Sequence, residues 1–128
     1  MKVLTAALTL LGILCGCSRS RDSIAAAPAF SVDGTPSAVY ERVLPRIQKI
    51  VADGTKVVRV DDANGLTMRF SMIRGDRSVR LVQVALQAKD TDVTQVSIRS
   101  EKFCFLRRTR DQADTAIEAE VAQILKEK

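Results

Sequence analysis

The amino-acid sequence predicts a single α+β domain, in which two helices cover one face of an antiparallel sheet of four to five strands. Three observations lead to this fold class. Apolar residues recur with helical spacing between Thr35 and Gly54, alternate with polar residues from Thr55 to Ser100, and return to helical spacing after Asp111. The predicted order of elements is β-α-β-β-β-β-α, and both amphipathic helices can cover the same face of the sheet.

The first strand and the first helix have clear local signals. Residues 29–33 alternate between apolar and polar side chains and predict a short strand. Thr35 is suited to cap a helix that has Pro36 at its first position, where no backbone donor is lost. We expect Pro45 to kink this helix and Gly54 to end it as a C-cap. Its apolar stripe consists of Val39, Tyr40, Val43, Leu44, Ile47, Ile50 and Val51.

Four further strands are predicted in residues 56–61, 66–72, 79–89 and 93–100. Val58 and Val60 share one face of the first of these strands. The turn signal Asn64-Gly65 and the short connections between the strands predict an antiparallel meander. No element is predicted in residues 101–110, because the pattern there has no clear period.

The last helix is predicted to begin near Asp111, whose carboxylate can cap the amide of Asp114. Its apolar stripe is formed by Ala113, Ile117, Val121 and Ile124, with Leu125 beside it. Over the whole domain, the residues expected in the core include Met68, Phe70, Val84 and Ile117.

The N-terminal residues indicate where the protein is located. Lys2 precedes an apolar run from Val3 to Leu14, which as a helix spans roughly 18 Å. A bilayer has a hydrocarbon core of about 30 Å, so this run suits a secretory signal peptide better than a membrane span.

The run ends in Leu14-Cys15-Gly16-Cys17, which resembles the lipobox of bacterial lipoproteins. The resemblance implies that Cys17 is lipidated and anchors the chain in a membrane. Because Ser18 rather than Asp follows Cys17, it also implies, in a Gram-negative cell, the periplasmic face of the outer membrane. The expected organisation is a signal peptide in residues 1–16, a tether in residues 17–28 and one domain in residues 29–128.

The composition argues against several classes of function. The chain contains no histidine, which removes the usual general base and the commonest metal ligand. It has no tryptophan and only 4% aromatic residues, and a net charge of +5 is too small to indicate nucleic-acid binding. We therefore expect no enzyme, no cofactor, no metal and no nucleic-acid partner. Cys104 is interpreted as a small buried hydrophobic residue, with an intermolecular disulfide or a reactive thiol as the alternative.

Arginines are the remaining candidates for a functional site. Arg69, Arg80, Arg107 and Arg108 are predicted to contact an anionic partner, since guanidinium groups bind phosphate and carboxylate in bidentate fashion. Arg69 is out of phase with Met68 and Phe70, so it is expected on the sheet face away from the helices. The competing interpretation is a solvated face in which arginine stems lie over apolar neighbours.

Two functions are consistent with these features. The first is a membrane-anchored, non-enzymatic periplasmic binding or assembly lipoprotein, whose partner is a protein or anionic lipid headgroups. The alternative is a carrier for a lipid or a small apolar ligand, held between the sheet and the first helix. A cavity lined by Val43, Met68, Phe70 and Met72 would favour the carrier.

Overall fold

The computed structural model describes residues 27–74, 77–104 and 107–127. Within these ranges, two helices and six strands form an α+β fold, which confirms the predicted class. In chain order the elements are β1 (Phe30–Asp33), α2 (Pro36–Gln48), β2 (Val58–Asp62), β3 (Gly65–Arg74), β4 (Ser78–Asp90), β5 (Val93–Cys104), β6 (Arg107–Thr109) and α3 (Gln112–Lys126). The predicted signal peptide, the lipid at Cys17, the Gly75-Asp76 turn and the side chains of Cys104 and Arg107 lie outside this description.

The six strands form one antiparallel sheet with the order β1-β5-β4-β3-β2, and β6 also pairs with β5. The expected count of four to five strands is corrected by β6, which comes from the stretch for which the sequence predicted nothing. β5 continues as far as Cys104, and β6 returns beside it, pairing Phe103 with Arg108. A strand of three residues is too short to show an alternating pattern, so its pairing with β5 is what defines it.

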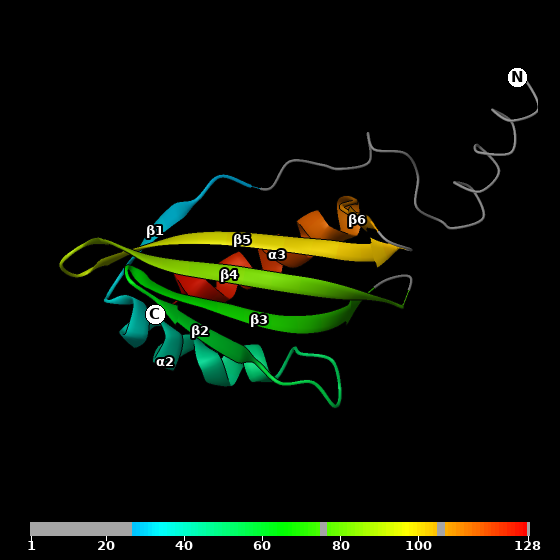
Figure 1. Cartoon of the computed structure of the whole chain (residues 1–128), viewed down its shortest axis with the longest axis horizontal. Helices are drawn as coiled ribbons and strands as arrows, with labels where there is room; N and C mark the ends of the chain where they lie inside the picture. The colour runs from blue at the N-terminus through cyan, green and yellow to red at the C-terminus, as the bar shows by residue number, and fades with distance from the viewer. Residues whose placement is uncertain (1–26, 75–76, 105–106, 128) are drawn as a thin grey trace, which may run out of the picture.

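Both helices lie on the same face of the sheet, as Figure 1 shows. Along the long strands, buried residues that face the helices alternate with less buried ones. In β3 the buried residues are Leu66, Met68, Phe70 and Met72. These side chains form one core with apolar residues of α2 and α3. The four residues expected in the core are confirmed, because Met68, Phe70, Val84 and Ile117 are at most 4% exposed.

The first helix begins where the sequence predicted and ends earlier. The hydroxyl of Thr35 accepts a hydrogen bond from the amide of Ala38 at 3.2 Å, and Pro36 occupies the first turn. The helix ends at Gln48 and not near Gly54. Beyond it the chain turns toward the sheet, and the amide of Ala52 donates to the carbonyl of Ser71 in β3 at 2.8 Å. The Ala52 amide thus has its hydrogen-bond partner in the sheet. A helix that continued past Ala52 would lose this bond to β3.

The second helix is capped as predicted. The carboxylate of Asp111 accepts from the amides of Ala113 and Asp114, at 3.0 and 3.2 Å. The carboxylate of Asp114 accepts from the amide of Asp111 at 3.0 Å, which completes a capping box. At the other end, Arg42 of α2 donates to the carbonyl of Leu125 at 3.1 Å, so the first helix supplies a partner to the last turn of the second.

Candidate functional site

The sheet face that points away from α2 and α3 is called the open face here, because neither helix covers it (Figure 1). Within the ranges that the structure describes, six large apolar side chains are exposed, and alternation along the strands places all six on this face. They are Val58, Val60, Ile73, Val79, Leu81 and Phe103. The register groups Ile73, Val79, Leu81 and Phe103 toward one end of the face, whereas Val58 and Val60 lie beside Arg69 and Thr67. A cluster of exposed apolar side chains is typical of an interaction site, whereas scattered ones are not.

Val58 and Val60 share one face of β2, as predicted, and this face is the open one. They are 53% and 44% exposed. The opposite side of β2 reaches over α2, where the guanidinium of Arg59 lies 4.8 Å from the ring centre of Tyr40. The outward valines are exposed because α2 and α3 both lie on the other face of the sheet (Figure 1).

Basic side chains lie across the same face in strand-to-strand register. Val58 of β2 pairs with Arg69 of β3, Arg69 pairs with Gln83 of β4, and Gln83 pairs with Arg99 of β5. Arg69 is exposed and points away from the helices, as predicted. One step along the strands, Leu81 pairs with Ser71 and with Glu101. The open face therefore has a basic row with Arg69 and Arg99, and the next row contains Ser71, Leu81 and Glu101.

A hollow of about 350 Å³ lies on this face between the basic side chains. We call it the basic hollow; its charged lining is Lys56, Arg69, Arg99, Arg108 and Glu101. Arg99 Nε lies 3.2 Å and Arg108 Nη1 lies 3.9 Å from the same carboxylate oxygen of Glu101. Among the residues described, Arg69 and Lys56 form no ion pair. Four cations thus share one anion, which leaves the hollow attractive to a negatively charged group.

Arg80 is not part of this surface, and the expectation that it contacts an anionic partner is wrong. Its side chain is 1% exposed and lies on the helix side of the sheet. The reason is its phase on β4, since Arg80 is two residues before buried Val82. Its Nη1 atom donates to Asp111 Oδ1 at 2.7 Å and to Asp114 Oδ2 at 2.9 Å. Of the other candidates, Arg108 lies on the open face, with its side chain 63% exposed.

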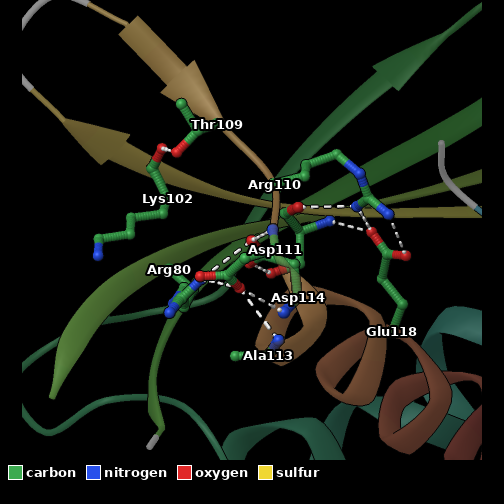
Figure 2. A network of polar contacts seen from close by, with 9 residues as sticks. Arg80, Lys102, Thr109, Arg110, Asp111, Ala113, Asp114 and Glu118 are labelled. Carbon is green, nitrogen blue, oxygen red and sulfur yellow. Dashed lines mark hydrogen bonds and ion pairs between the residues drawn. The ribbon is translucent and has the colours of Figure 1, made fainter. Parts of the chain in front are cut away.

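A second buried arginine completes a cluster under the start of α3, shown in Figure 2. Arg110 Nη2 donates to Glu118 Oε1 at 3.0 Å, and Arg110 Nη1 also binds Glu118. Arg110 Nη1 donates to the carbonyl of Ser100 at 2.9 Å, and the amide of Ser100 donates to Glu118 at 2.7 Å. The buried ionic cluster is defined as Arg80, Arg110, Asp111, Asp114 and Glu118.

This cluster was not predicted from the sequence, although the sequence contains a signal for it. The expected stripe of α3 included Ala113 and Ile124, which are only half-buried. The fully buried positions are Ile117, Val121 and Leu125 together with Asp114 and Glu118. The two carboxylates are four residues apart on the apolar face of an amphipathic helix, and this placement indicates that they have buried cationic partners.

The cluster also shifts the pKa of its most exposed member. Partial burial of Asp111 disfavours its charged form and alone would raise its pKa. The hydrogen bond and the charge of Arg80, with the amides of Asp114 and Ala113, outweigh burial, so the pKa of Asp111 lies below its usual value. The carboxylate therefore stays ionised in the folded protein.

The four residues named for a carrier cavity lie in the core. Val43, Met68 and Met72 are 0% exposed, Phe70 is 4% exposed, and all four belong to one packed apolar cluster. A more apolar hollow of about 590 Å³ lies elsewhere, between the start of β1 and α3, beside Phe30, Ile98 and Ala122. It is not the space between the sheet and the first helix that the carrier hypothesis required.

Comparisons with known proteins add no further assignment. The chain matches no family model, no curated protein and no solved structure. In residues 27–74, 77–104 and 107–127, no three side chains of His, Cys, Asp or Glu are arranged to hold a metal ion. No helix in the same ranges is long and apolar enough to cross a membrane. The candidate site therefore rests on the geometry of the open face.

Proposed function

We propose that this protein is a membrane-anchored, non-enzymatic binding lipoprotein that acts through the open face of its sheet. One observation carries the proposal. In the described part of the chain, the exposed large apolar side chains gather on the face that also holds the basic hollow. Exposed apolar surface costs free energy in water, and a partner that covers it recovers that cost.

The chemistry of the chain supports a binding role. No histidine is present anywhere in the sequence to act as a general base. The buried carboxylates Asp114 and Glu118 are engaged by Arg80 and Arg110, so they act as structural counter-ions. The tight packing of Val43, Met68 and Met72 favours a binding surface over an internal carrier cavity.

The anchor is Cys17, on the resemblance of Leu14-Cys15-Gly16-Cys17 to a lipobox. We assign the protein to the periplasmic face of the outer membrane because Ser18 follows that cysteine. Substituting Cys17→Ala tests the anchor. The variant is expected to remain an unprocessed precursor or to leave the membrane fraction, and a variant of mature size that still sediments with membranes contradicts the assignment.

A labelling experiment tests the open face without assuming what covers it. Gln83→Cys places a thiol in the middle of that face, and Gln48→Cys places one at the exposed end of α2. Both are made with Cys104→Ala, so that no other thiol of the domain reacts. A membrane-impermeant maleimide is applied to native envelopes opened on the periplasmic side and to the purified protein.

We expect Gln83→Cys to react slowly in envelopes and rapidly after purification, because a partner covers the open face only in the first sample. Gln48→Cys should react rapidly in both. Equal, rapid labelling of Gln83→Cys in both samples would overturn the proposed function. Matching thermal unfolding of the two variants shows that the comparison is made on the same fold.

A further inference from the structure

We infer that the partner of the open face is an anionic bilayer surface, onto which the domain docks with its apolar end toward the acyl chains. This inference rests on the proposed function and names its partner. The open face has an apolar end, formed by Ile73, Val79, Leu81 and Phe103, next to the basic row of Arg69 and Arg99.

The spacing of the two kinds of side chain fits the boundary between headgroups and acyl chains. Ile73 and Val79 are register partners near the connection from β3 to β4. Arg69 and Ile73 are four positions apart on β3, which is about 13 Å along a strand. Long arginine side chains reach lipid phosphates while apolar neighbours enter the layer beneath, as in other proteins that lie on membranes.

Repulsion between like charges argues against a second copy of this chain as the partner. An isologous contact through the open face would place the four cations of one basic hollow against the four of another. Within the lining of each hollow, Glu101 is the one acidic residue that would offset them. An anionic surface complements the same four cations, so charge complementarity favours it.

The shape of the face decides between a bilayer and an acidic protein. Tight protein interfaces centre on an anchor side chain seated in an apolar pocket. The hollow of the open face mixes apolar side chains, among them Leu81, with Ser71, Gln83 and charged residues, so it is not an apolar pocket. Val79 and Phe103 lie outside the hollow and are 52% and 54% exposed. Protruding apolar side chains beside a basic hollow suit a fluid anionic surface better than a rigid partner.

The proposed anchor allows this orientation. Ten residue steps separate Cys17 from Ala27, the first described residue, and a chain of that length reaches at most about 36 Å. The five-strand width of the sheet is about 19 Å. The tether is therefore long enough to turn the open face onto the bilayer that holds the lipid, and it raises the local concentration of headgroups around that face.

A single tryptophan tests the inference, because the chain contains none of its own. Val79→Trp reports on the apolar end, and Gln48→Trp reports on the helix layer. The mature protein, isolated from membranes, is reconstituted into vesicles of phosphatidylcholine alone or with phosphatidylglycerol. If the isolated protein carries no lipid on Cys17, it is mixed with the same vesicles instead of being reconstituted into them. Brominated acyl chains then quench any tryptophan that enters the bilayer.

We expect quenching and a blue shift for Val79→Trp in the anionic vesicles at 0.1 M salt. Both should disappear at 1 M salt, where the Debye length is about 3 Å. Gln48→Trp should stay unquenched in every vesicle. When Arg69→Glu is combined with Val79→Trp, the ratio of quenched to unquenched protein should fall by about tenfold or more. Lys49→Glu, which makes the same charge change at the exposed end of α2, should leave that ratio unchanged.

Three results overturn the inference. They are equal quenching in neutral and anionic vesicles, equal quenching of Val79→Trp and Gln48→Trp, and no quenching of a folded Val79→Trp protein. If quenching is absent while Gln83→Cys stays protected in envelopes, the partner is a macromolecule such as an acidic protein, and the proposed function stands. If Gln83→Cys is also unprotected, both proposals fail.

Discussion

The two faces of the sheet use the same side chain in opposite ways. On the helix side, Arg80 and Arg110 are each 1% exposed, and each binds a carboxylate of α3. On the open face, Arg99 and Arg108 keep 53% and 63% of their side chains exposed and share one carboxylate. Which side of the sheet an arginine faces therefore decides whether it has a dedicated partner.

This difference has a physical cause. A guanidinium removed from water must recover its hydration energy from counter-charges and hydrogen bonds, or the fold is destabilised. The domain meets this requirement by placing Asp114 and Glu118 on the buried face of α3. Exposed arginines keep their water and need no such partner, so they remain available to an external anion.

The buried ionic cluster also closes a gap in the sheet edge. β1 pairs with residues 93–96 of β5, and β6 pairs with residues 102–104. Between them, the amide and the carbonyl of Ser100 bind Glu118 and Arg110 in place of a neighbouring strand. The same ion pair thus neutralises a buried charge, satisfies the sheet edge and fixes α3 against β5.

The largest expected effect comes from breaking the cluster. Glu118→Ala leaves Arg110 buried without its counter-ion and removes the partner of the Ser100 amide, so we expect a loss of about 3–5 kcal/mol in the free energy of unfolding. Urea denaturation measures it. Arg110→Met combined with Glu118→Leu should recover only part of the loss, because Ser100 still lacks its partners. A cost below about 1 kcal/mol for Glu118→Ala would show that the cluster is not a structural requirement.

The two sides of the sheet also differ in their aromatic residues. Phe70 is 4% exposed and Phe103 is 54% exposed. Phe70→Ala is expected to cost about 3–5 kcal/mol, because it leaves a cavity in the core. Phe103→Ala should change stability by no more than about 0.5 kcal/mol. Similar costs for both substitutions would contradict the assignment of the open face as solvent-exposed.

A pH series tests how much the charge of Asp111 stabilises the fold. Asp111 is the most exposed member of the buried ionic cluster. Its pKa is lowered in the folded protein, so its charge stabilises the fold above the unfolded pKa of about 3.9. That stability is lost as the pH falls through the folded value. Asp111→Asn keeps the helix cap and removes the charge, and it should cost roughly 1 kcal/mol at pH 7. Urea midpoints of the two proteins should converge well below pH 4, whereas a pH-independent difference would exclude the charge as the cause.

The smallest effect on stability is expected on the open face. Arg69→Glu should shift the free energy of unfolding by no more than about 0.5 kcal/mol, since Arg69 is exposed and makes no ion pair among the described residues. The same substitution is the one expected to weaken docking most clearly. Thermal unfolding of the variant beside the wild type measures the first effect. A large destabilisation would place Arg69 in the structural framework and remove it from the contact surface.

Much of the fold was predictable because its signals are local. Thr35 and Asp111 cap the two helices, and the alternation through Met68 and Phe70 defines the inward side of β3. Each of these depends only on residues a few positions apart. The exposed position of Arg69 follows from the same alternation, so part of the candidate site was predictable too.

The tertiary structure alone decided which charges are buried and which apolar residues are exposed. Arg80 and Asp114 are 34 positions apart, and no local pattern states that they meet. β6 is a strand because it pairs with β5, and the outward valines of β2 are exposed because neither α2 nor α3 packs on that side. Periodicity determines which side chains share a face. Burial of that face depends on what the folded chain places against it, and this requires contacts between residues far apart in the sequence.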